Sequence, residues 1–261
     1  MADRPVGLFR AMIGLGGDLT KTKNESGRER ISEAGRARGG ERYFWVSFIL
    51  TLLCNQIPFQ GARLLVRNRV HYSMALPVDS LVPFLPWMIG VYLGCFVFWF
   101  LLYRLVARLP REKADRFFGA NLLAKAVIFL FYIFLPTKMT RPELTGTGFW
   151  YACLRFMYWI DEPNNLFPSL HCLIAWLCWL GVRGNRDVPL PWRAAALVMA
   201  VAVCFSTLAI RQHVLLDVIG GVLLSEICYA LAALPALRGL YAALADRLIL
   251  LLFPARETAA D

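Results

Sequence analysis

Six long apolar runs constrain the fold of this chain more than any other feature of its sequence. They lie near residues 43–66, 81–106, 117–135, 167–182, 192–210 and 214–234. Most are close to the roughly 20 residues that a helix needs to cross the hydrocarbon core of a bilayer. Because lipid offers the backbone no hydrogen-bond partners, a crossing segment must satisfy its own amides, as a helix does. The sequence therefore predicts an all-α integral membrane protein, a bundle of six transmembrane helices.

Composition favours a membrane over nucleic acid as the partner of the chain. Hydrophobic residues make up 58% of it, against roughly 45–50% in soluble domains. The formal net charge is +10, but the basic residues lie between the apolar runs instead of forming one basic domain, so no nucleic acid is expected to bind. The seven cysteines have no spacing typical of a zinc site or a disulfide framework. No metal and no other cofactor is expected.

Three segments flank or interrupt a predicted catalytic membrane domain at 43–235. Residues 1–42 are expected to form a basic cytoplasmic tail. The Trp- and Tyr-rich segment 148–160 is too short to cross, so it is expected either to lie in the outer interface or to cap the bundle. Residues 236–261 form a C-terminal amphipathic segment, which either lies on the inner surface or continues the last span.

The lysines and arginines predict the orientation of the bundle. With the N-terminus in the cytoplasm, 20 of the 28 basic residues fall on the inner side and seven on the outer side, with Lys125 inside the third run. Cytoplasmic loops of membrane proteins carry such an excess of positive charge. We therefore expect both termini in the cytoplasm of a cell-membrane protein, and the polar segments 136–142, 167–171 and 211–217 on the extracytoplasmic side.

Two of the three histidines lie in short polar motifs, F-P-S-L-H at 167–171 and R-Q-H-V-L-L-D at 211–217. His213 and Asp217 are four residues apart and therefore share one face of the predicted sixth helix. A carboxylate there can accept a hydrogen bond from one imidazole nitrogen and raise the basicity of the other, which would make the histidine a nucleophile. The alternative is a buried pair that only stabilises a helix end. Because ionisable groups near lipid are costly and usually functional, we favour the nucleophile.

His171 lies at the predicted first turn of the fourth helix, after Pro168 and Ser169. Proline favours a helix start, and the free N–H groups of that start attract phosphate. A histidine on the same turn can protonate a leaving oxygen. A lone histidine at a helix start is more often structural, but a second histidine at the same membrane face favours a catalytic role.

Three cations are expected near the two histidines: Lys138 and Arg141 in the segment P-T-K-M-T-R-P at 136–142, and Arg211. Phosphoryl transfer requires neutralisation of the phosphate oxygens, which Arg and Lys side chains supply. Each could instead anchor the chain at the headgroup level. Because all three are predicted at one face, they are assigned to phosphate binding.

The motifs at 138–142, 168–171 and 211–217 resemble the three signature motifs of the type-2 phosphatidic acid phosphatase superfamily, which includes the inositol phosphorylceramide and sphingomyelin synthases. The resemblance covers about residues 43–235 and implies six transmembrane helices with an outward-facing site. It implies that His213 attacks phosphorus to form a phosphohistidine.

The resemblance also assigns supporting roles. Asp217 orients His213, His171 protonates the departing alkoxide, and the phosphate oxygens are held by Lys138, Arg141 and Ser169.

The chain departs from the superfamily pattern at two positions. Thr207 stands where the phosphatases have an arginine, which Arg211 is expected to replace, as in the transferase and related branches. Phe134 stands where the first motif normally has its lysine, and Lys138 follows it.

These features support three hypotheses about function. The first is a metal-independent phosphatase that hydrolyses a lipid phosphate through a phosphohistidine. The second is a phosphotransferase that moves an inositol phosphate- or phosphocholine-like headgroup from a phospholipid onto a lipid alcohol. The third is a non-catalytic lipid-binding membrane protein, which would have no physical need for the set of His171, His213 and Asp217.

Overall fold

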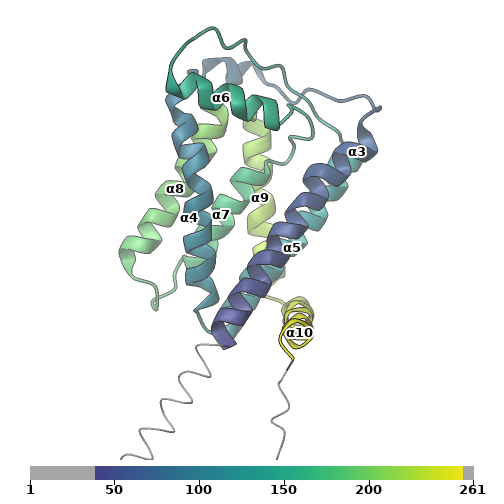
Figure 1. Ribbon diagram of the computed structural model, residues 1–261, viewed down its shortest axis with the longest axis vertical. Helices are drawn as coiled ribbons and strands as arrows, with labels where there is room; N and C mark the ends of the chain where they lie inside the picture. Colours follow the sequence, from purple (N-terminus) through teal and green to yellow (C-terminus); the bar gives the residue numbers. More distant parts are fainter. Residues whose placement is uncertain (1–38, 255–261) are drawn as a thin grey trace, which may run out of the picture. The chain divides into compact units, whose positions relative to one another are not determined.

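Helices make up nearly all of the regular structure in the computed structural model, which describes residues 39–254 (Figure 1). The predicted tail at 1–42 lies almost wholly outside the described residues, as do residues 255–261. The residues from Tyr43 onward group into one unit, and the fold is described for that unit. Between 39 and 254 the only β-structure is two isolated bridges, Tyr72 with Thr137 and Lys138 with Asn164. The all-α prediction is therefore confirmed for the described part.

The first described helix, Gly39–Val66, contains a π-helical turn near its end. The labelled elements, in chain order, are η1 (Ile57–Gly61), α3 (Ala62–Val66), η2 (Pro77–Leu81), η3 (Pro86–Met88), α4 (Ile89–Ala107), α5 (Arg111–Phe134), α6 (Phe149–Ile160), α7 (Leu170–Val182), α8 (Leu190–Ala209), α9 (Leu215–Leu231) and α10 (Pro235–Leu252).

Four of the described helices are long and apolar enough to cross a membrane: Gly39–Val66, Pro86–Ala107, Arg111–Phe134 and Leu190–Ala209. A fifth candidate is the pair α9 and α10, which is bent by 90° at the break between the two helices. Helix α7, expected from the sequence to be the fourth span, has only 13 residues. By length and composition the described residues therefore hold four or five candidate spans.

Helix α7 lies at the centre of the bundle, in contact with α4, α5, α8 and α9 (Figure 1). Nearly all of its side chains are buried, including Leu173, Leu177 and Leu180. It packs closely enough that a Cβ at Gly181 would lie 2.8 Å from the ring of Phe117. An apolar helix surrounded by other helices is stabilised by packing on all sides. The surrounding helices thus hold the start of α7, which carries His171, at a fixed place.

Candidate active site

The start of α7 is fixed by its N-cap residue and by the neighbouring helix α9. The Ser169 hydroxyl accepts a hydrogen bond from the backbone N–H of Cys172 at 3.3 Å, which satisfies one free amide of the first turn. The backbone N–H of Ser169 donates to the carbonyl oxygen of Asp217 at 2.9 Å. The predicted phosphate ligand Ser169 is fully buried and does not line the cavity described below. In this structure Ser169 joins the polar motif at 167–171 to the polar motif at 211–217.

Thr137, in the first polar motif, holds the segment that leads into α7. Its hydroxyl oxygen accepts hydrogen bonds from the N–H groups of Leu166 at 2.8 Å and Phe167 at 3.0 Å. Its carbonyl accepts from Asn165 at 2.7 Å. The three polar motifs, at 136–142, 167–171 and 211–217, are therefore linked by hydrogen bonds of Thr137 and Ser169.

His213 lies in the turn between α8 and α9 and is held by Asp217. The imidazole Nδ1 lies 3.3 Å from Asp217 Oδ2, and the same oxygen accepts the Val214 N–H at 3.0 Å. Burial alone would lower the pKa of His213, but the hydrogen bond and the charge of Asp217 raise it above the ordinary value of 6.5. In this arrangement Nδ1–H donates to the carboxylate, so Nε2 carries the free lone pair.

His171 is enclosed by aromatic side chains from α4. Its ring centroid lies 4.5 Å from that of Tyr92, 5.7 Å from Trp99 and 5.9 Å from Phe96. The Tyr92 hydroxyl lies 3.4 Å from Nδ1 of His171. This aromatic group was not predicted, although residues 92, 96 and 99 share one helix face, which is visible in the sequence.

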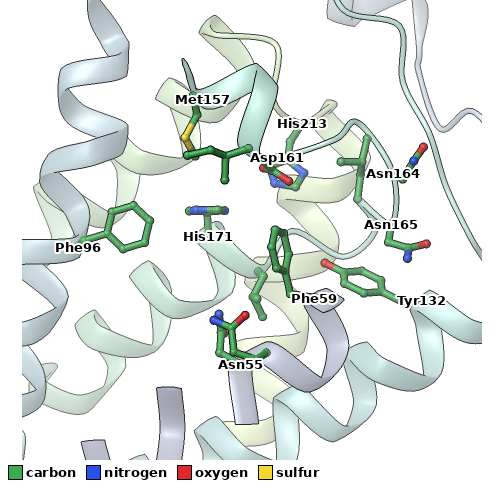
Figure 2. A pocket seen from close by; sticks show the side chains of 14 residues that line it. Asn55, Phe59, Phe96, Tyr132, Met157, Asp161, Asn164, Asn165, His171 and His213 are labelled. Atoms are coloured by element: carbon green, nitrogen blue, oxygen red, sulfur yellow. The ribbon is translucent and has the colours of Figure 1, made fainter. Parts of the chain in front are cut away.

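The two imidazoles line the same cavity. Their ring centroids are 6.2 Å apart, and both line a cavity of about 230 Å³ (Figure 2). One phosphate group would fit between them, because an attacking or hydrogen-bonding nitrogen lies about 3 Å from its partner atom. The cavity is lined by Asn55, Gln56, Phe59, Phe96, Tyr132, Met157, Ile160, Asp161, Asn164, Asn165, Leu166, Leu170, His171 and His213.

Arg141 lies behind the wall that Asp161 forms. Its guanidinium donates from Nη1 to the carbonyl oxygens of Asp161 at 2.5 Å and Tyr158 at 3.4 Å, and from Nη2 to the side-chain oxygen of Gln212. It also lies over the Tyr158 ring, 4.4 Å from its centroid. Burial lowers the pKa of Arg141, and the charge of Asp161 opposes that shift. The guanidinium is therefore fixed beside the cavity without being one of its lining groups.

Lys138 and Arg211 lie outside the cavity lining. Lys138 is exposed, and its backbone N–H donates to Tyr72. The Arg211 guanidinium donates to the carbonyl oxygens of Asp79 at 2.8 Å and Val82 at 2.7 Å. Arg211 therefore stabilises the η2 segment. Its guanidinium is not among the groups that line the cavity with the two imidazoles.

Asp161 also lines the cavity and was not among the predicted site residues. It follows α6 and is near Arg141 and His213. Burial raises the pKa of its carboxyl group above the ordinary value, and the charges of Arg141 and of a protonated His213 oppose that shift only in part. Figure 2 shows Asp161 next to His213 over the cavity. The available signal was the polar run D-E-P-N-N at 161–165, which ends one residue before the F-P-S-L-H motif.

No group of three or more His, Cys, Asp or Glu side chains that could hold a metal ion occurs within residues 39–254. The described cavity brings together two imidazoles and the carboxylate of Asp161, with Asp217 bonded to one imidazole and a guanidinium alongside. This set is suited to binding and cleaving a phosphate ester by nucleophilic attack.

A comparison with family models agrees with this class of site. The model described as the PAP2 superfamily matches residues 85–231, more than half of the chain and the part from the start of α4 to the end of α9. The chain belongs to the PAP2 superfamily, and this membership supports a phosphatase- or phosphotransferase-type activity. No curated protein and no solved structure matches the chain.

Proposed function

We propose that the protein is a membrane enzyme that cleaves a lipid phosphate ester through a phosphohistidine formed on His213. The observation that carries this proposal is the pair of imidazoles with ring centroids 6.2 Å apart across one cavity. One of them has its Nδ1 held by Asp217. A carboxylate, an oriented histidine and a second histidine across a phosphate-sized gap are the groups that such a reaction requires.

In the first step, the Nε2 lone pair of His213 attacks phosphorus, and the bond from phosphorus to the departing alcohol oxygen breaks. His171 donates its proton to that oxygen. Asp217 stabilises the positive charge that develops on the His213 ring, and Arg141 offsets the charge of the phosphate from behind the wall. In the second step, an acceptor hydroxyl attacks phosphorus while His171 takes its proton, and the bond from phosphorus to Nε2 breaks.

The acceptor decides between two activities that share the first step. With water, the enzyme is a metal-independent lipid phosphatase that releases inorganic phosphate. With a lipid alcohol, it is a phosphotransferase for a headgroup such as inositol phosphate or phosphocholine, as in the synthase branch that the motifs resemble. The donor in either case is a lipid phosphate or a phospholipid of the surrounding membrane.

The proposed setting is the extracytoplasmic side of the cell membrane, in a bundle of six crossings. Four of the six crossings would be the four long apolar helices described above. The other two would be α7 and α9. Helix α7 reaches only part of the way through a bilayer, since 13 residues of helix span about 20 Å. Its first turn would therefore lie below the outer surface, where a lipid phosphate can enter between the helices.

Purified protein in detergent, with a chelator present and a panel of lipid phosphates and phospholipids, tests the proposal. We expect His213→Ala to lower turnover by about 10³-fold or more, because it removes the nucleophile. An acid-labile phosphoryl group should be trapped on His213 in the unmodified protein. The matched control is His71→Ala: His71 lies in the loop after α3, bonded to the Arg69 carbonyl, and its loss should leave turnover unchanged.

Turnover that persists in His213→Ala would overturn the proposed chemistry. No turnover on any lipid of the panel would favour the third class, a membrane protein that binds lipid without reacting with it. Release of inorganic phosphate and headgroup exchange between lipids separate the two enzymatic activities.

A further inference from the structure

The cavity holds few positive charges for a phosphate site. Of its lining residues in the described chain, three can carry a charge near neutral pH, His171, His213 and Asp161, and none is lysine or arginine. The Arg141 guanidinium lies next to this wall, and its donor bonds go to Asp161, Tyr158 and Gln212.

The Asp161 carboxylate has no task in the phosphohistidine mechanism. Arg141 binds the main-chain carbonyl of Asp161 and not its side chain, and no hydrogen bond to the Asp161 carboxylate occurs within residues 39–254. The side chain lies beside His213 and lines the space where a phosphate would sit (Figure 2). A negative group at that place opposes the binding of further negative charge.

The charge balance of the site follows from these positions. In the first step of the proposed mechanism His213 is neutral and His171 carries the proton. The two cations at the site, Arg141 and His171, are then matched by two carboxylates, Asp161 and Asp217. Lys138 and Arg211, the two cations that could have balanced more charge, are respectively exposed to solvent and bonded to the η2 segment. The site therefore offers no surplus of positive charge.

We infer that Asp161 is a specificity-determining residue that makes this site selective for phosphodiesters over phosphomonoesters. The inference rests on the proposed function. A phosphomonoester carries between about 1.5 and 2 negative charges at neutral pH, because its second pKa is about 6, whereas a phosphodiester carries one. The donor is then a phospholipid with a headgroup, and the chain transfers or releases a phospho-headgroup instead of inorganic phosphate.

The rest of the cavity suits the second substituent of a phosphodiester. In the first step the new bond joins Nε2 of His213 to phosphorus and one ester oxygen leaves with the proton from His171. The other ester substituent, the headgroup, stays on phosphorus. In the second step the acceptor takes the phosphoryl group together with this headgroup. Four uncharged carboxamides line the cavity and can hydrogen-bond such a polar headgroup: Asn55, Gln56, Asn164 and Asn165.

The test compares two lipids with identical acyl chains, phosphatidate as the monoester and phosphatidylglycerol as a diester with an uncharged headgroup. Turnover is measured with the full chain in mixed micelles with chelator, for wild type and Asp161→Asn. We expect the wild type to prefer the diester, and Asp161→Asn to raise kcat/KM for phosphatidate relative to the diester by about 10- to 100-fold, the effect of removing one unit charge from a partly buried site. The substitution keeps the main-chain carbonyl that binds Arg141.

The matched control is Glu162→Gln, the same change of charge one residue later. Glu162 is half exposed, pairs with Arg63 and does not line the cavity. It should leave the ratio between the two lipids unchanged. Retained thermal stability of Asp161→Asn shows that any change in the ratio does not come from misfolding.

Three results would overturn the inference alone: a wild type that prefers phosphatidate, an Asp161→Asn variant that loses activity on both lipids equally, or a variant that loses only turnover of a lipid with a cationic headgroup, such as the zwitterionic phosphatidylcholine. The last would make Asp161 a ligand of a headgroup cation. Absence of turnover on both lipids, together with absence of a trapped phosphoryl group on His213, would overturn the proposed function and this inference with it.

Discussion

At the scale of single residues, the hydrogen bond between Asp217 and His213 sets the pH dependence of the proposed reaction. The attacking imidazole must be neutral, and Asp217 raises the pKa of His213 above 6.5. We therefore expect kcat/KM to fall as the pH falls through a value above 6.5, where His213 takes up a proton. Asp217→Asn should move this acidic limb to lower pH and lower the maximal rate by roughly 10²- to 10⁴-fold, because the ring loses its orienting carboxylate.

A pH–rate profile of both forms measures the two effects separately. The control Glu162→Gln removes the same charge at a residue that pairs with Arg63 and does not line the cavity, so it should leave the limb in place. An acidic limb that stays at the same pH in Asp217→Asn would show that another group controls the rate.

Tyr92 is expected to act as a positioning residue for His171. Tyr92→Phe keeps the ring that lies 4.5 Å from the imidazole but removes the hydroxyl near Nδ1. We expect kcat with a lipid alcohol as leaving group to fall about 10-fold, the effect of one lost orienting hydrogen bond. Turnover of the matching nitrophenyl ester should change little, because nitrophenolate leaves without a proton. An equal loss on both substrates would indicate a structural role only.

Part of the site could be predicted from its residues, because the chain contains few histidines. A chain with three histidines offers few imidazoles, and the positions of His171 and His213 beside apolar runs were visible in the sequence. The side-chain direction of Arg211 was not, because it depends on a backbone with φ of 55° and on carbonyls of η2, more than 100 positions earlier. Asp161 was missed for a similar reason, since the path of a loop brings it to the cavity.

At the scale of elements, two glycines of α9 allow that helix to pass directly beside the start of α7. A Cβ at Gly221 would lie 2.5 Å from the Ser169 carbonyl oxygen, and one at Gly220 would lie 2.6 Å from the Phe167 ring. Gly221→Ala must therefore displace the backbone that carries His171. We expect a loss of about 1–3 kcal/mol in stability, seen as a lower Tm, and a larger proportional loss of turnover, because the two imidazoles move apart.

The control for this substitution is Gly94→Ala in α4, where a Cβ would meet no atom within 4 Å. The same change of residue in an open position should leave Tm and turnover close to wild type. An active and stable Gly221→Ala variant would show that α7 and α9 can separate without harm to the site.

The starts, ends and bends of the helices were the features that the sequence predicted least accurately. Hydropathy gives the apolar character of 167–182 but not the helix start, which the structure places at Leu170 after its Ser169 cap. The π-helical turn at Ile57–Gly61 is equally invisible, because its register depends on packing against α5. The 90° bend between α9 and α10 does have a sequence signal, the proline at position 235, which cannot continue a helix by donating a hydrogen bond.

At the scale of the whole described unit, the polar motifs gather at one end of the bundle. The loops that follow α5 and α8 and the segment before α7 lie at the end near α6, whereas the turn between α7 and α8 lies at the other end (Figure 1). Two exposed cations mark these ends. Lys138 lies beside Asn164 of the cavity wall, and Arg186 lies in the turn after α7.

The excess of basic residues at the second end predicts that it faces the cytoplasm. Lys138→Cys should therefore react with a membrane-impermeant maleimide added to intact cells, and Arg186→Cys should react only after the membrane is permeabilised. The wild-type chain, which has seven cysteines of its own, gives the background for both variants. Reaction of Arg186→Cys alone in intact cells would place the two imidazoles at the cytoplasmic leaflet, and the enzyme would then draw its lipid from that leaflet.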